Sequence, residues 1–248
     1  MDLDSSFLLF LAVGFAAQMV DGALGMAYGV SSTTLLLGMG VAPAPASASV
    51  HMAEVVTSGV SGLSHWKFGN VDRALFRRLV LPGVIGGIIG AYVLASLPGD
   101  KLKPWVALYL MLMGVIVLRR AFGKYFPEPT QKGLRRLGLA GGFLDAIGGG
   151  GWGPVVTSTL VANGRAPRYA IGSVNLAEFF VATAQSATFF MTIGLIHWQI
   201  IAGLMLGGVL AAPLAAHLCK RIPTRPLMIM VGLLIVALSA RTMVLSLR

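Results

Sequence analysis

The sequence has little of what a soluble, disulfide-bonded or metal-binding protein needs. Only 11% of its 248 residues are charged and 56% are hydrophobic, which is too apolar for a soluble domain. A single cysteine, Cys219, excludes an internal disulfide, and without cysteine–histidine clusters we expect neither a metal centre nor a cofactor. The mean hydropathy of +0.81 instead indicates a polytopic helical membrane protein.

The first residues also lack the basic stretch of a secretory signal. Met1-Asp2-Leu3-Asp4 carries no lysine or arginine, so we expect the apolar stretch from Phe7 to stay as an uncleaved part of the fold. The net charge of +10 comes from lysines and arginines in loops between apolar segments. This placement carries information about membrane topology and does not indicate a nucleic-acid partner.

Ten apolar segments, five in each half, predict an all-α protein in the lipid bilayer. They cover residues 5–20, 23–40, 45–64, 77–97, 104–118, 134–148, 154–163, 168–192, 198–219 and 226–246. The basic residues divide 15 to 4 between alternate sides of these segments. Because basic residues gather in cytoplasmic loops, the sequence predicts an inner-membrane protein with both termini in the periplasm.

The two halves of the chain repeat one another 124 residues apart. Between the pairs 21/145 and 54/178, 13 of 34 aligned positions are identical without a gap, where chance would give roughly three in so biased a composition. We therefore predict one membrane domain, 1–248, built from repeat one (1–120), a cytoplasmic linker (121–133) and repeat two (134–248). An odd number of crossings per half would make these inverted-topology repeats.

Two stretches are expected to contain broken or re-entrant helices near the pseudo-twofold axis. The segment 154–163 is too short to cross a bilayer, which takes about 20 residues. The stretches 5–40 and 134–163 are therefore predicted to break around Asp21-Gly22 and around Gly148 to Gly153. Each half would have either five full spans or three spans and a hairpin, and the basic residues do not distinguish these.

Four carboxylates recur inside the apolar sequence: Asp21 and Glu54, repeated as Asp145 and Glu178. Glu54 lies about 15 Å along its predicted helix, near the middle of a bilayer core of about 30 Å. An ionised carboxylate is costly there, so burial favours the protonated form and predicts a proton-accepting role. The alternatives are that the glutamates only hydrogen-bond helices together and that the aspartates cap broken helices.

Glycine-rich stretches with an aromatic residue follow both aspartates. Gly148 to Pro154 contains four consecutive glycines and then Trp152, and its counterpart, Gly25 to Gly29, contains Tyr28. Glycine lets several backbone N–H groups converge at a helix start, which favours an anion. The alternative is that these glycines only permit close packing.

These motifs resemble those of the TauE/SafE family of sulfite and organosulfonate exporters. The resemblance rests on residues 18–29, on 46–54, and on 148–154 followed by Pro167-Arg168 and 172–175, and it covers essentially the whole chain. It implies a membrane carrier that moves small sulfur-containing anions, such as sulfite or sulfonates, outward in many members.

With this resemblance we assign candidate residues to substrate and proton. The substrate candidates are Gln18, Tyr28, Ser49, His51, Gly150, Gly151, Trp152, Ser173 and Asn175. The proton-coupling candidates are Glu54, Asp21, Glu178 and Asp145. Asn175 stands where repeat one has His51, so the two halves are chemically unequal.

Two other functions are weighed against anion export. The four carboxylates would also suit a cation/proton antiporter, because acidic oxygens ligate metal cations. Asp21 and Asp145 would resemble an aspartyl protease pair, but their repetition in a transport-like duplication argues against an enzyme. Glycine and alanine at every fourth position, from Gly83 to Ala91 and from Gly203 to Ala215, predict close helix contacts within the bundle or in a homodimer.

Overall fold

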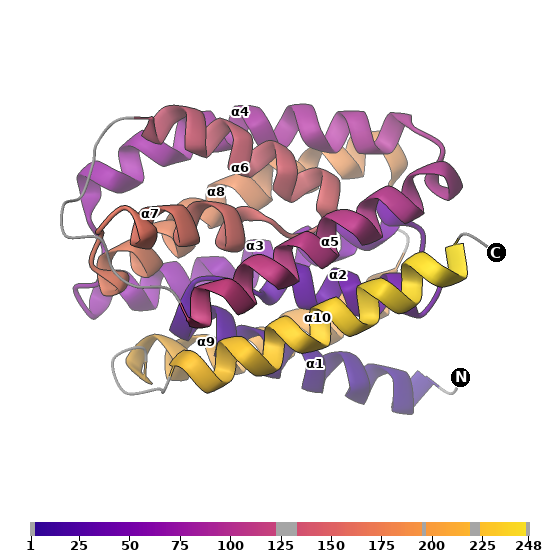
Figure 1. Ribbon diagram of the computed structural model, residues 1–248, viewed down its shortest axis with the longest axis horizontal. Coiled ribbons are helices and arrows are strands. Elements are labelled where there is room, and N and C mark those ends of the chain that lie inside the picture. The colour runs from indigo at the N-terminus through magenta and orange to yellow at the C-terminus, as the bar shows by residue number, and fades with distance from the viewer. Residues whose placement is uncertain (1–2, 123–132, 195–196, 219–223, 247–248) are drawn as a thin grey trace.

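The computed structural model is a bundle of helices, most of which lie along one long direction (Figure 1). It describes residues 3–122, 133–194, 197–218 and 224–246, and every regular element in these ranges is a helix. Repeat one holds α1 (Leu3–Leu24), α2 (Tyr28–Gly38), α3 (Pro43–Lys67), α4 (Arg73–Ser96) and α5 (Gly99–Ala121). Repeat two holds α6 (Leu134–Gly148), a π-helix η1 (Trp152–Thr157), α7 (Ser158–Ala162), α8 (Pro167–Ile193), α9 (Trp198–Leu218) and α10 (Thr224–Ser246). Most of the predicted linker, residues 123–132, lies outside the described residues.

Six helices in the described ranges are long and apolar enough to cross a membrane. They are α1, α4, α5, α8, α9 and α10. At 25 residues, α3 is as long, but His51, Glu54 and several serines lower its hydropathy. By contrast, α2 has 11 residues and extends only about 16 Å, so it cannot cross a bilayer core alone.

Both repeats contain a helix break at the same point of the sequence. In repeat one the backbone leaves the helix after Leu24, with positive φ angles at Gly25 (66°) and Ala27 (121°), and α2 starts at Tyr28. In repeat two it leaves after Gly148, with φ of 63° at Gly149 and 154° at Gly150. The first break therefore begins at Gly25, three residues after the predicted Asp21-Gly22, which the structure places inside the last turn of α1.

The two repeats interlock instead of forming separate halves. Their helices start at equivalent positions, with Tyr28 and Pro43 matched by Trp152 and Pro167. However, α1 packs along α9 of the other repeat, and α4 packs along α6. The equivalent helices α3 and α8 pack against each other in antiparallel orientation, since Gly59 faces Phe179 while Gly62 faces Leu176.

The glycines and alanines at every fourth position of α4 and α9 allow these helices to pack closely against α6 and α1. A side chain at Gly142 would collide with the backbone of Gly83 and Gly87 in α4, and one at Gly207 would collide with the backbone of α1. Ala91, Ala211 and Ala215 are buried as well. The rows are thus used inside the chain, where small residues let helix backbones approach closely. The homodimer stays a prediction.

The apolar core consists of several clusters. One joins Met26 and the α5 residue Leu110 to Ile235 in α10, and another surrounds Trp152 with residues of α4 and α8. Buried polar side chains occur mainly on α3 and α8, and the buried carboxylates Asp21 and Asp145 add α1 and α6. These helices therefore position the candidate site.

Candidate functional site

All four predicted intramembrane carboxylates are buried in the structure. Asp21, Glu54, Asp145 and Glu178 are only 3%, 2%, 1% and 6% exposed. Glu178 lies within electrostatic reach of the other three, although they come from four different helices. Ionisation of all four at once would be costly, because like charges repel strongly where water is excluded.

His51 connects two of these acids across the two repeats. Its Nδ1 atom lies 3.0 Å from Glu54 Oε2, one helical turn further along α3. Its Nε2 atom lies 3.7 Å from Asp145 Oδ2, which α6 contributes from repeat two. An imidazole between two carboxylates can take up a proton from one side and release it on the other, so this triad is suited to proton transfer.

The carboxylate of Asp145 holds the second helix break together. The backbone N–H groups of Gly151 and Trp152 both donate to its Oδ1 atom, at 2.8 and 2.9 Å. The Gln185 side chain in α8 donates to Oδ2 at 2.9 Å. The glycine-rich stretch thus presents two N–H donors at a helix start, and in this conformation both are occupied by the protein's own Asp145 side chain.

The equivalent contact in repeat one is longer. Asp21 Oδ1 lies 3.5 Å from the backbone N–H of Tyr28, the first residue of α2. Both aspartates therefore face the start of the helix after the break, as the capping alternative requires, but only Asp145 makes short bonds there. The two repeats are unequal at this point.

The two helix breaks lie against each other. A side chain at Gly29 would meet the Cα atom of Gly150 at 2.7 Å and Oε1 of Glu54 at 3.0 Å. Thr33 donates a short hydrogen bond to the carbonyl oxygen of Gly149. Glu54 therefore lies beside the point where the broken backbones of the two repeats cross.

The aromatic residues of the two breaks are anchored to neighbouring helices. The Tyr28 hydroxyl donates to the carbonyl oxygen of Leu204 in α9, at 2.9 Å. Trp152 Nε1 donates to the carbonyl oxygen of Val174 in α8, at 3.1 Å. Gln18 is also buried, and its Nε2 atom has no hydrogen-bond partner in the described structure. Among these three candidates, Gln18 has the polar atom that is free for a ligand.

Ser173 and Asn175 lie in a polar network at the first turns of α8. Ser173 Oγ accepts from the backbone N–H of Asp72 at 2.8 Å, and Asn175 accepts from Ser61 at 2.7 Å. Close by, Arg168 donates to the Asn70 side chain at 2.6 Å. These hydrogen bonds join α8 to α3 and to the α3–α4 connection.

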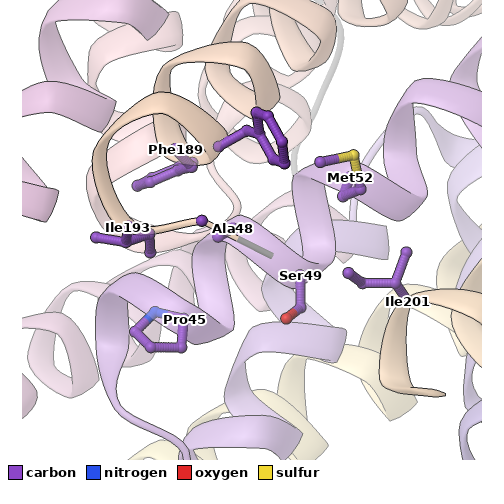
Figure 2. A pocket seen from close by; sticks show the side chains of 9 residues that line it. Pro45, Ala48, Ser49, Met52, Phe189, Ile193 and Ile201 are labelled. Atoms are coloured by element: carbon purple, nitrogen blue, oxygen red, sulfur yellow. The ribbon is translucent and has the colours of Figure 1, made fainter. Parts of the chain in front are cut away.

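Ser49 lies in a narrow cleft between α3, α8 and α9 (Figure 2). The cleft contains about 270 Å³ of atom-free space including open solvent, and its walls are mostly apolar, with Met52, Phe189 and Ile201 among them. The ring of Phe189 lies 6.2 Å from the ring of His51, measured between centroids. Phe189 therefore lies between the cleft and His51 with its two carboxylates.

Two residues near the site were not predicted from the sequence. Gln185 had a usable signal, because it follows Glu178 by two helical turns on the polar stripe of α8. Tyr109 had none, because no motif in the apolar helix α5 distinguishes it from its neighbours. Its hydroxyl is buried beside Gly151 without a hydrogen-bond partner in the described structure.

No group of three or more histidine, cysteine, aspartate and glutamate side chains could hold a metal ion within the described part of the chain.

Comparison with known proteins gives two matches and one negative result. A model of the family described as "Sulfite exporter TauE/SafE" matches residues 10–242. A Bacillus subtilis (strain 168) protein named "Probable membrane transporter protein YtnM" is 45% identical over 247 residues, which cover 96% of this chain and 82% of that protein. No solved structure matches.

Proposed function

Because the chain belongs to the sulfite exporter TauE/SafE family and is thus a membrane transporter, we propose that it exports sulfite or a small organosulfonate by alternating access, coupled to protons. The observation that carries the proposal is the buried crossing of two helix breaks, where N–H donors and a histidine–carboxylate triad meet. The donors suit an oxyanion, and the triad suits a proton. The other proposed substrate residues, Gln18, Ser49, Ser173 and Asn175, would contact the anion in conformations that expose it to either side.

The binding step that we propose uses Asp145 as an exchangeable occupant of the anion site. When ionised, its carboxylate accepts the N–H groups of Gly151 and Trp152. A proton delivered through His51 would neutralise Asp145 and weaken these charge-assisted hydrogen bonds. The N–H groups would then be available to a sulfite or sulfonate oxygen, so that binding of the anion and protonation favour each other.

Alternating access is supported by the different contacts at the two ends of α3 and α8. The end near Ser49 has an apolar cleft. The opposite end has a chain of hydrogen bonds in which Arg168 donates to Asn70, Asn70 donates to His65 at 3.1 Å, and His65 donates to the Gly22 carbonyl oxygen at 3.0 Å. Breaking this chain would be the step that opens the second side.

An inverted arrangement of the repeats follows from the helix directions if α3 and α8 both cross the bilayer. They are equivalent in sequence and pack antiparallel, so one repeat would point opposite to the other. We propose that the stretches 5–40 (α1 with α2) and 134–163 (α6 with η1 and α7) are re-entrant hairpins, so that each half has three full spans and a hairpin. We further propose that the termini are periplasmic and that the protein lies in the inner membrane.

This topology predicts opposite labelling of two exposed basic positions. In a chain with Cys219 replaced by serine, Lys101→Cys should react with a membrane-impermeant maleimide added outside, and Arg136→Cys should react only after permeabilisation. Lys101 lies at the start of α5 and Arg136 at the start of α6, on predicted opposite sides. Outside labelling of position 136 alone would contradict the topology.

The transport activity itself can be tested in proteoliposomes. We expect an imposed proton gradient to drive sulfite or a small organosulfonate such as taurine across the membrane at least about tenfold faster than in protein-free liposomes. Sulfate, chloride and a sodium gradient serve as comparisons. Transport of sodium or calcium in exchange for protons, without movement of any sulfur anion, would contradict anion export and support the cation/proton antiporter.

A further inference from the structure

A second cavity, with about 510 Å³ of atom-free space including open solvent, lies at the junction of α3, α4 and α8, at the end of α3 opposite to the Ser49 cleft. Its walls are Trp66, Val71, Arg73, Phe76, Arg77 and Leu176. Two arginines thus share a small cavity with four apolar residues. This combination suits a ligand that has both an anionic and a hydrocarbon part.

The charge inside this cavity is positive. The guanidinium group of Arg73 lies 5.4 Å from the ring centroid of Trp66, which orients it by a cation–π contact. Arg77 follows one turn later on α4. The neighbouring acid, Asp72, is engaged elsewhere, because it pairs with Arg165 at 3.2 Å and accepts the backbone N–H of Ala74.

An apolar surface continues from the cavity along the helices. Phe76 contacts Phe180 of α8, with ring centroids 5.7 Å apart. Phe180 is 42% exposed, and Leu63 on α3 is 54% exposed. In a membrane protein such side chains face the acyl chains of the bilayer, and tryptophan is typical of the headgroup level. The cavity therefore lies where a lipid would place its phosphate, with its chains along Phe180 and Leu63.

The other repeat provides an internal comparison. By the 124-residue offset, Trp66, Arg77 and Leu176 correspond to Phe190, Ile201 and Met52, which line the cleft in Figure 2. The same helix junction thus occurs twice, and the two arginines Arg73 and Arg77 are replaced in the other repeat by His197 and Ile201. The two arginines lie at the end of the helices where the sequence places most basic residues, which is the predicted cytoplasmic side. The cytoplasmic leaflet is also the one that carries anionic lipids.

From these observations we infer that the Trp66–Arg73–Arg77 cavity is a binding site for an anionic phospholipid, with the phosphate held between the two guanidinium groups. The phosphate would receive charge-assisted hydrogen bonds from both arginines. Trp66 and Phe76 would cover the glycerol and the first carbons of the acyl chains.

The test is native mass spectrometry of the purified chain with added phosphatidylglycerol or phosphatidylcholine. We expect phosphatidylglycerol to bind at least about tenfold more tightly than phosphatidylcholine, and the Arg73→Gln/Arg77→Gln variant to lose this difference. Arg135→Gln/Arg136→Gln is the matched control, because it removes two exposed arginines from the first turn of α6 without touching the cavity. It should bind like the unaltered chain.

A second variant tests the shape of the cavity while leaving its charge intact. Val71→Phe places a ring in the cavity and should weaken phosphatidylglycerol binding several-fold. Size-exclusion chromatography shows whether each variant is folded. The inference is overturned if the control loses as much affinity as the cavity variant, if Val71→Phe and Arg73→Gln/Arg77→Gln both bind normally, or if inorganic phosphate at equal concentration displaces the lipid.

Discussion

Replacing Glu54 by glutamine is expected to abolish transport driven by a pH gradient while preserving exchange of the anion across the membrane. Glutamine keeps the size of glutamate and a polar carbonyl group, but it cannot bind and release a proton. Glu54 lies 3.0 Å from His51 and beside the crossing of the two breaks, so the change removes the proton and leaves the packing intact. We expect gradient-driven uptake to fall at least about 100-fold, the scale of a lost proton-transfer group.

Glu178→Gln is the matched control, because it makes the same substitution at the equivalent position of repeat two. There Asn175 stands in place of His51, and an amide cannot relay a proton. The control should therefore reduce coupling less. Initial rates in proteoliposomes at several pH values, with and without a gradient, separate exchange from coupled transport. Glu54→Gln should flatten the pH dependence, and an unaltered response to the gradient would show that Glu54 only hydrogen-bonds its neighbours.

Gly150→Ala is expected to cause the largest loss of stability. A methyl group there would collide with the backbone of Gly29 and Val30, and Gly150 has a φ of 154°, which side chains rarely permit. The two breaks would have to separate, taking Glu54 away from Asp145. Overpacking and backbone strain together should cost about 2–5 kcal/mol and lower the Tm in detergent by roughly 5–15 °C.

Gly133→Ala is a control that separates the cost of backbone strain from the cost of a steric clash. Gly133 also has a positive φ, 79°, but no other part of the described structure lies within 4 Å of its added methyl group. It should therefore lower the Tm by only about half as much or less. Equal losses in both variants would mean that the contact between the breaks adds nothing to stability. If Gly150→Ala folds, its transport rate measures how far the crossing matters for function.

The sequence by itself determined the class of protein, its duplication and the places where helices start. Pro43 and Pro167 both occupy the first turn of a long helix, where the N–H group that proline lacks is not needed for a helical hydrogen bond. Glu54 follows His51 by three residues, a spacing that puts both side chains on one face of a helix, so their contact follows from the sequence. Such features depend on the spacing of residues along one helix and on the offset of 124 residues between the repeats. Both can be read directly from the residue numbers.

Only the tertiary structure decided which helices meet. The small residues in α4 and α9 predicted close helix contacts but did not identify the partner helices. The structure pairs α4 with α6 and α9 with α1. Glycine allows close approach by any helix of suitable shape, so its position does not specify the partner. The contact of His51 with Asp145, the hydrogen bond of Gln185 to Asp145 and the position of Tyr109 all depend on this interlocking. The sequence supplied the acids and the glycines, and the packing of one repeat into the other placed them at one crossing.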